Sequence, residues 1–343
     1  MSKVTMQDIA NALSTSRISV WKALNNRPGI SETLRRQVID KSDELGYRRL
    51  DVPEAEHTQT QTVSVVIARP ESSLFWMKIV HQIARELSKK GINLMYTSMP
   101  TNYQEGYTLP AALTDGSVDG IMVLNIYSGP ILCMLGGLEI PKVFLDTVTD
   151  VPCRDLHGDV VFIEGRSLVR EITARVLGTG RSRLGFVGDV RYAQTNMDRY
   201  HGFLDAHAAL GLQPDPAFSR TGPLGLRTHF EELSAFLDSL PQMPDAFICA
   251  SDFIAHFLRQ YFEEKQISGV LLTGFDNNNE YLNIAQSITT VNVQTHRMGT
   301  RLVDKLMFRM RYPDASDEVS YIFSDILFSQ ELRAAAPSAG KQR

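Results

Sequence analysis

The sequence predicts an α/β protein in which a small all-α helix-turn-helix headpiece precedes two doubly wound parallel-sheet subdomains. In the first 50 residues, apolar side chains recur at the three- and four-residue spacing of short helices. From Thr62 onward, nearly continuous apolar runs alternate with amphipathic helical patterns, as is typical of parallel strands buried on both faces. A chain of 343 residues is long enough for two or three domains.

The headpiece is expected to begin with two short helices joined by a tight turn. Thr5 is a good N-cap for the first helix, and Asp8 suits the positive end of its dipole. Ser16 can cap the second helix in the same way. The inward stripe of the second helix consists of Val20, Ala23 and Leu24.

The outward face of this second helix carries an unusual set of side chains for a solvated surface, namely Arg17, Ile18, Trp21 and Lys22. Two cations together with Ile and Trp suit a helix laid in the major groove of DNA. The plainer alternative is a helical hairpin with a basic surface. For Ile18 and Trp21, packing against a neighbouring element remains open.

A third helix completes the headpiece, with Ser31 as its cap and Gly46 as its end. Its buried face is predicted to contain Leu34, Val38 and Leu45. Residues 1–50 hold nine Lys and Arg against five Asp and Glu, whereas the whole chain has a net charge of −4. A cationic end on an anionic body is the charge pattern expected of a protein that binds a phosphate backbone.

The headpiece resembles that of the LacI/GalR transcription regulators. The matching segments are Val4-Thr5-Met6-x-Asp8-Ile9-Ala10, Ser16, Val20, Ala23-Leu24-Asn25 and Glu44-Leu45-Gly46-Tyr47. The resemblance implies that Arg17, Ile18 and Lys22 read base edges, where Arg or Lys to guanine is the commonest specific contact. The full set of DNA-binding residues that it implies is Thr5, Ser16, Arg17, Ile18, Ser19, Trp21, Lys22, Asn25 and Ser31.

The sequence departs from the family pattern at two places. Ser14 replaces the usual turn Gly, a change that has a modest cost if the φ of Ser14 stays negative. The linker at 48–62 carries Pro53 and Glu54, and it has Glu56 where the family has a Leu that wedges into the minor groove. Because phosphate repels carboxylates, we expect this hinge to be disordered or weakly helical and not to wedge DNA.

In the core, the apolar runs predict strands at 63–67, 92–99, 118–124, 143–146, 184–187, 247–250 and 270–273. Helical patterns occur at 76–90, 103–113, 166–178, 197–210 and 296–311. The pattern restarts after the segment near 159–165. We expect a headpiece at 1–47, a hinge at 48–62, a core at 63–334 and a tail at 335–343.

The core resembles that of the same family, which is itself similar to periplasmic sugar-binding proteins. The matching segments include Ser117–Ile121, Phe144–Asp146, Gly185–Asp189, Arg199–Phe203, Thr273–Asp276, Thr289–Asn292 and Met298-Gly299. The resemblance implies crossings between subdomains near 160, 290 and 323. Subdomain 1 would then hold 63–162 and 290–323, and subdomain 2 would hold 163–289 and 324–334.

Ligands of open α/β sheets bind beyond the carboxyl ends of strands, which points to Asp146 and Asp276. The resemblance adds Arg199, in the first turn of its helix, as a third residue that would hold a sugar's hydroxyls. It also suggests Phe75 and Trp76 as effector-contacting aromatics. Turn chemistry, a surface ion pair and core packing are the structural alternatives. Ser251 stands where many relatives have Asn, so it completes the expected effector set only provisionally.

Enzyme motifs are absent from the sequence: there is no HExxH, no GxSxG and no paired metal-ligand cluster, so we expect neither a metal nor a cofactor. Gly178-Thr179-Gly180 follows a helix and reads as a helix-end turn. Asp146 with Asp276 could imitate a glycosidase pair, but the headpiece gives no reason to prefer that. The isolated residues Cys133, Cys153 and Cys249 are expected to be small core hydrophobes, in a reducing compartment.

The sequence therefore predicts a cytoplasmic DNA-binding transcription regulator, a repressor, because it has no signal peptide and no membrane-length apolar run. The expected partners are double-stranded operator DNA, a second copy of the chain and a sugar-like effector, or a nucleoside or purine as in some relatives. By analogy, helices 76–90 and 103–113 form the dimer interface, and the tail has no heptad for a tetramer. The alternative is a cytoplasmic sugar sensor with weak or lost DNA binding.

Overall fold

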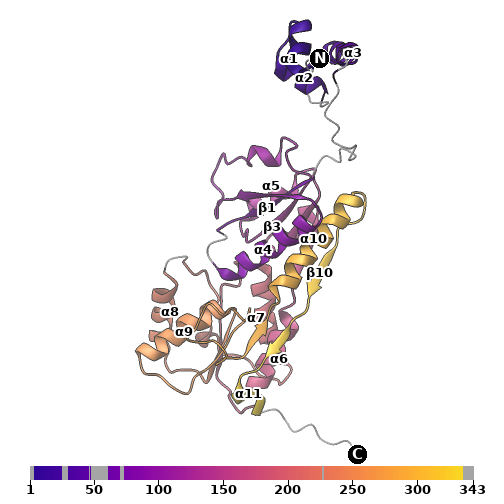
Figure 1. Cartoon of the computed structure of the whole chain (residues 1–343). Coiled ribbons are helices and arrows are strands. Elements are labelled where there is room, and N and C mark those ends of the chain that lie inside the picture. The colour runs from indigo at the N-terminus through magenta and orange to yellow at the C-terminus, as the bar shows by residue number, and fades with distance from the viewer. Residues whose placement is uncertain are drawn as a thin grey trace, which may run out of the picture. The chain divides into compact units, whose positions relative to one another are not determined.

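The computed structural model describes residues 4–24, 30–45, 47, 61–69, 73–225 and 228–334 (Figure 1). The chain divides into two units, Met1–Gln59 and Thr60–Arg343. The expectations for the hinge residues Asp51, Pro53, Glu54 and Glu56, and for the tail at 335–343, lie outside the described residues.

The headpiece consists of α1 (Met6–Ala12), α2 (Arg17–Leu24) and α3 (Glu32–Glu44). Thr5 and Asp8 form a reciprocal capping box, in which each side chain accepts a hydrogen bond from the other's backbone N–H. Ser16 and Ser31 cap α2 and α3 as expected, accepting from the N–H groups three residues later at 3.0 and 3.2 Å. The three helices enclose a small core of Ile9, Ala10, Val20, Ala23 and Val38.

The condition for a modest cost at Ser14 is not met, because its φ is +50°. The N–H of Ser14 donates to Asn11 O at 3.3 Å, and that of Thr15 donates to Ala10 O at 3.0 Å. These two bonds form a Schellman motif, which satisfies the last carbonyls of α1 only when the residue after the C-cap is left-handed. The turn therefore imposes on Ser14 a conformation that a glycine would adopt without strain.

The first sheet of the core contains six parallel strands in the order β10-β5-β4-β3-β1-β2. They are β1 (Thr62–Ile67), β2 (Asn93–Ser98), β3 (Gly120–Leu124), β4 (Lys142–Leu145), β5 (Asp159–Ile163) and β10 (Val319–Ile322). The helices α4 (Leu74–Lys89) and α10 (Thr295–Arg311) pack side by side on one face (Figure 1). The helix α5 (Gly129–Gly136) belongs to a separate apolar cluster on the other face.

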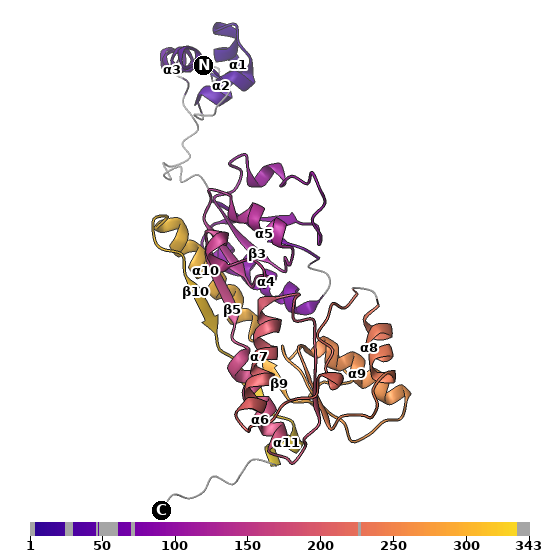
Figure 2. The ribbon, with the colours of Figure 1, turned by 180° about the vertical axis from the view of Figure 1, so that it is seen from behind.

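The second sheet has three parallel strands in the order β6-β7-β8. They are β6 (Leu184–Val187), β7 (Ala246–Cys249) and β8 (Leu271–Thr273). Around them lie α6 (Arg166–Leu177), α7 (Gln194–Ala208), α8 (His229–Asp238) and α9 (Asp252–Glu264). Figure 2 shows α6 against α7, and Gly202 permits this approach because a Cβ there would lie 2.2 Å from Arg166 O.

A two-stranded antiparallel ribbon completes the core. It pairs β9 (Thr290–Asn292) with β11 (Asp325–Leu327), and a short helix, α11 (Gln330–Ala334), follows. Three single-turn 3-10 helices occur at Ala111–Leu113, Cys153–Leu156 and Pro216–Phe218. The chain thus returns to the first sheet at β10 between the two ribbon strands.

Several expectations about the core need correction. No α-helix forms at 103–113, where Gly106 has a φ of +79° and Pro110 precedes a single 3-10 turn. The helix predicted at 197–210 starts earlier, at Gln194, so Arg199 lies in its second turn rather than its first. Cys133 is exposed and is therefore no core residue, whereas Cys249 is buried. Among the described helices, none is both long and apolar enough to cross a membrane.

Candidate functional site

A cavity of about 500 Å³ lies at the carboxyl ends of β1, β3 and β4 and beyond the end of β8. Segments that follow strands of both sheets line it, which is the usual place for a ligand in doubly wound folds. All six effector residues expected from the sequence line this one cavity, namely Phe75, Trp76, Asp146, Arg199, Ser251 and Asp276.

Strained backbone is concentrated around the cavity. Four of its lining residues have positive φ although none is glycine: Arg69 at +46°, Asn125 at +52°, Asp146 at +69° and Asp276 at +102°. Each of them lies just beyond a strand. Such conformations are unfavourable for residues with a Cβ and persist where the surrounding structure imposes them, often at ligand sites.

Asp146 is fully engaged by protein donors. Its Oδ1 accepts from the N–H groups of Thr147 at 2.8 Å and Thr195 at 3.3 Å. Its Oδ2 accepts from Thr195 Oγ1 at 2.5 Å and from Tyr127 OH at 3.5 Å. Since Thr195 lies on α7, this carboxylate joins the end of β4 to the helix layer of the second sheet. Burial raises the pKa of Asp146 to about 6, against the lowering effect of the Thr195 and Thr147 hydrogen bonds.

Arg199 is buried at the centre of the cavity wall. Its Nη1 donates to Ala250 O at 2.5 Å, and its guanidinium carbon lies 3.6 Å from the centre of the Phe275 ring, a cation–π geometry. Its Nη2 lies 3.8 Å from Asp276 Oδ1. Within the described part of the chain, Arg199 Nε has no hydrogen-bond partner. The guanidinium of Arg199 thus keeps hydrogen-bonding capacity that the described residues do not use.

Asp276 contrasts with Asp146 in its hydrogen bonds. Its carboxylate accepts none from the residues that the structure describes, and its one charged neighbour at ion-pair distance is Arg199. Burial raises the pKa of Asp276 to about 7, while the charge of Arg199 opposes that rise. Asp276 therefore has acceptor capacity for ligand hydroxyls.

Aromatic rings form much of the remaining wall. Phe75 and Trp76 meet edge to face, with ring centroids 5.2 Å apart, and Tyr127 and Tyr192 lie 4.3 Å apart. The sequence analysis missed several lining residues: Arg69, Asn125, Tyr127, Tyr192, His229, Phe253 and Tyr281. Arg69 and Asn125 could have been found, because each follows a strand that the apolar pattern had predicted.

Ser251 lines the cavity, but its hydroxyl also has a structural partner. It is the N-cap of α9, and its Oγ accepts from Ile254 N at 3.4 Å. A serine at this position thus starts the helix and leaves a short side chain at the cavity wall. The contact expected of Asn in relatives is replaced here by a smaller group.

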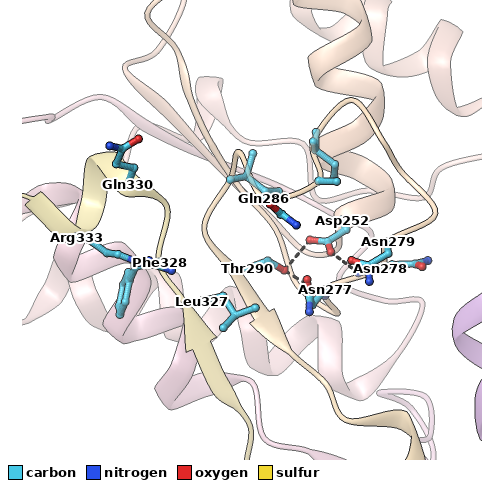
Figure 3. A pocket seen from close by; sticks show the side chains of 13 residues that line it. Asp252, Asn277, Asn278, Asn279, Gln286, Thr290, Leu327, Phe328, Gln330 and Arg333 are labelled. Atoms are coloured by element: carbon cyan, nitrogen blue, oxygen red, sulfur yellow. Dashed lines mark hydrogen bonds between the residues drawn. The ribbon is translucent and has the colours of Figure 1, made fainter.

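A second cavity, of about 510 Å³, lies beside the ribbon and shares Asn278 with the first (Figure 3). At its base Thr290 Oγ1 donates to Asp252 Oδ1 at 2.7 Å, and Asn278 N donates to Asp252 Oδ2 at 2.8 Å. Burial raises the pKa of Asp252 to about 6, against these hydrogen bonds. Asp252 thereby ties the loop that follows Asp276 to strand β9.

In the headpiece, Arg17 is exposed, and Lys22 and Ser19 are half-buried. Ser19 Oγ lies 2.9 Å from Ser16 Oγ. Thr5 and Ser31 are exposed caps. Ile18 and Trp21 lie on α2, but their side chains, like the whole of Asn25, lie outside the described residues.

Known proteins match both a part of the core and nearly the whole chain. Residues 173–324 match the periplasmic binding protein-like domain family. Over 96% of both chains, the sequence is 23% identical to the HTH-type transcriptional repressor PurR of Actinobacillus pleuropneumoniae serotype 3 (strain JL03). It is 24% identical to the HTH-type transcriptional regulator CelR of Thermobifida fusca, over 89% of this chain and 92% of that protein. The chain is thus similar over nearly its whole length to proteins named as HTH-type transcription regulators.

Solved structures agree with this similarity at the level of the fold. A transcriptional regulator CelR–cellobiose complex matches with a TM-score of 0.65 and 21% identity, over 95% of this chain and 98% of that one. The lac repressor dimer bound to operator and the anti-inducer ONPF matches with a TM-score of 0.64 and 16% identity, over the same shares. The fold class predicted from the sequence is therefore confirmed.

Proposed function

We propose that this protein is a sequence-specific DNA-binding transcription regulator of the LacI/GalR family, a repressor, controlled by a small polyol effector in the cavity around Arg199 and Asp276. The observation that carries the proposal is the pairing of an unsatisfied carboxylate with a guanidinium that keeps a donor, in a cavity between two sheets. A carboxylate can accept from two adjacent hydroxyls while Arg donates in a fork. The cavity binds its ligand and does not turn it over.

The two sheets are linked across this cavity by hydrogen bonds that an effector can alter. Besides the Asp146–Thr195 bonds, Gln194 N donates to Thr147 O at 2.8 Å, and Leu74 N donates to Glu280 Oε2 at 3.2 Å. An effector shifts the angle between the sheets only if it binds one arrangement more tightly than another. The proposed crossings between the subdomains are near 160, 290 and 323.

Operator recognition is assigned to α2 and the helix caps around it. Arg17 and Lys22 would contact bases, with Ile18 beside them. The sugar-phosphate backbone would meet Thr5, Ser16, Ser19, Trp21, Asn25 and Ser31. Two headpieces of a homodimer would read two half-sites. Because its ligand would be DNA, the protein would act in the cytoplasm.

The dimer interface is proposed on α4, where Leu74 and Met77 are 49% and 44% exposed. Exposed apolar side chains that gather on one element mark a contact surface. The edge strand β2 adds Leu94. The segment 103–113, expected earlier as a second interface helix, does not form one.

The test is a fluorescence anisotropy titration with an operator selected from random duplexes, repeated across salt concentrations. A regulator loses affinity steeply as salt rises, because phosphate contacts release counterions, and it prefers the selected sequence. Arg17→Ala should weaken binding by about 1–3 kcal/mol and relax the preference at one base pair. Arg154→Ala is the control, because Arg154 is exposed on the surface of the unit Thr60–Arg343. Binding that is undetectable or indifferent to salt would favour the sugar sensor without a DNA partner.

A further inference from the structure

The cavity contains a second guanidinium, at the end of the first strand. Arg69 follows β1 and lines the same cavity as Arg199, which lies on α7. The two cations thus come from opposite sheets. The sequence analysis gave Arg69 no role, and the pairing of Arg199 with Asp276 does not use it.

The carboxylates that line the cavity have neighbours other than Arg69 within the protein. Asp276 faces Arg199, and Asp146 receives four donors. The Asp189 carboxylate accepts from the N–H groups of Arg191 at 3.0 Å and Tyr192 at 3.2 Å. Among the described residues, none of these three carboxylates forms an ion pair with Arg69.

Arg69 differs from these charged residues in its surroundings. It forms no ion pair within the described residues, and its Nε is buried there without a hydrogen-bond partner. Its described polar neighbour is the Tyr192 phenol, whose pKa is raised by burial while the charge of Arg69 and its hydrogen bond oppose that rise. A neutral phenol supplies no counter-charge. A partly buried cation without one is unfavourable until an anion arrives.

The position of Arg69 is also imposed by its surroundings. Its backbone has a φ of +46°, which a long side chain seldom adopts. Asn125 Nδ2 holds the segment by donating to Ala68 O at 2.7 Å and to Arg69 O at 3.5 Å. The protein therefore maintains an unfavourable backbone conformation at Arg69, whose guanidinium forms no described ion pair and lines the cavity.

We propose that the effector carries an anionic substituent, a carboxylate or a phosphate on a sugar-sized body, and that Arg69 binds it. The inference rests on the proposed function and defines its ligand class. A guanidinium matches both anions because its planar fork donates two parallel hydrogen bonds. Asp276 and Arg199 hold hydroxyls of the same ligand, and Tyr127 and Tyr192 flank its ring. A cavity of about 500 Å³ is large enough for such a body.

The test uses matched families of neutral and anionic probes with the full-length protein. Glucose is compared with glucuronate and glucose 6-phosphate, galactose with galacturonate and galactose 6-phosphate, and adenosine with AMP. Thermal shift finds the binders, and calorimetry at fixed ionic strength gives their Kd values. We expect at least one anionic probe to bind about tenfold or more tightly than its neutral counterpart. The carboxylate and phosphate arms identify which anion it is.

Arg69→Gln removes the charge and keeps most of the side chain, so it should abolish the preference for the anionic probe. Arg69→Lys keeps the charge without the fork and should retain part of that preference, which also guards against a folding defect in one variant. Arg154→Gln removes an exposed charge from the 3-10 helix Cys153–Leu156 and should change nothing.

Three outcomes reject the inference: no anionic probe binds, neutral and anionic probes bind equally, or Arg69→Gln keeps the full preference. The proposed function fails separately. If a neutral polyol binds, depends on Asp276 and releases operator DNA, the regulator stands and only the anionic class is lost. If an anionic probe binds through Arg69 but never alters operator affinity, the ligand class stands and the regulator is lost.

Discussion

Asp146 and Asp276 occupy corresponding places in the two halves of the core, one beyond β4 and the other beyond β8, and both have positive φ. Their surroundings differ. The Asp146 carboxylate receives four hydrogen bonds, two of them from Thr195, whereas the Asp276 carboxylate faces the cavity beside Arg199. A place at a strand end thus positions an acid without deciding its role. The first acid joins two layers, and the second is open to a ligand.

The largest expected effect separates these roles directly. Asp276→Asn should lower the affinity for a bound polyol about 10- to 100-fold, since a hydrogen bond to a charged group contributes about 1.5–3 kcal/mol. Asp146→Asn should lower the melting temperature more than it lowers affinity, because the amide turns one acceptor into a donor facing Thr195. Calorimetry and thermal melts of both variants measure the two effects. Equal losses of affinity would remove the distinction.

A smaller effect concerns pH. Burial raises the pKa of Asp276 from 3.8 to about 7 in the folded protein, so the folded state holds this proton more tightly than the unfolded one. The contribution of Asp276 to stability is therefore fully present below about pH 4 and is lost as pH rises toward 7. Melting of the wild type and of Asp276→Asn should diverge over this window, with the variant losing less stability. Parallel pH profiles would contradict the burial of an ionisable carboxyl.

The smallest effect extends the comparison of left-handed residues to the headpiece. Ser14→Gly should stabilise the α1–α2 turn by about 0.5–1 kcal/mol, because glycine adopts a φ of +50° without strain. The greater conformational entropy that glycine gives the unfolded chain keeps this gain small. Hydrogen exchange of α1 and α2 amides in the full chain measures it. Asn11→Gly, in exposed helix, is the control and should destabilise α1 by about 0.3 kcal/mol, since Asn is itself a weak helix former. Faster exchange in Ser14→Gly would contradict the strain at Ser14.

The sequence was informative where local chemistry decides the structure. The caps at Thr5, Ser16 and Ser31 and the buried strand of 120–124 follow from short-range patterns. The segment 103–113 misled because its weak apolar pattern hides Gly106 and Pro110. The helix α5 was missed because its short, apolar sequence has no polar face for a periodic pattern to show.

The members of the cavity were largely predictable, but their hydrogen-bond state was not. The carboxyl-end rule together with family resemblance placed Asp146, Arg199 and Asp276 in one cavity. The hydrogen bond from Thr195 to Asp146 depends on how the two sheets approach each other, and no local sequence pattern contains that information. That Arg69 forms no ion pair within the described residues can be seen only in three dimensions.

Asp252 links two segments of the core through its carboxylate. Each of its two oxygens is bonded to a different segment, the backbone after Asp276 and the side chain of Thr290 in β9. Strand β9 continues through a few residues into α10, which lies along α4. A ligand that displaces Asp276 would therefore act through β9 on α10, which packs against α4, the helix that carries the proposed dimer contacts Leu74 and Met77.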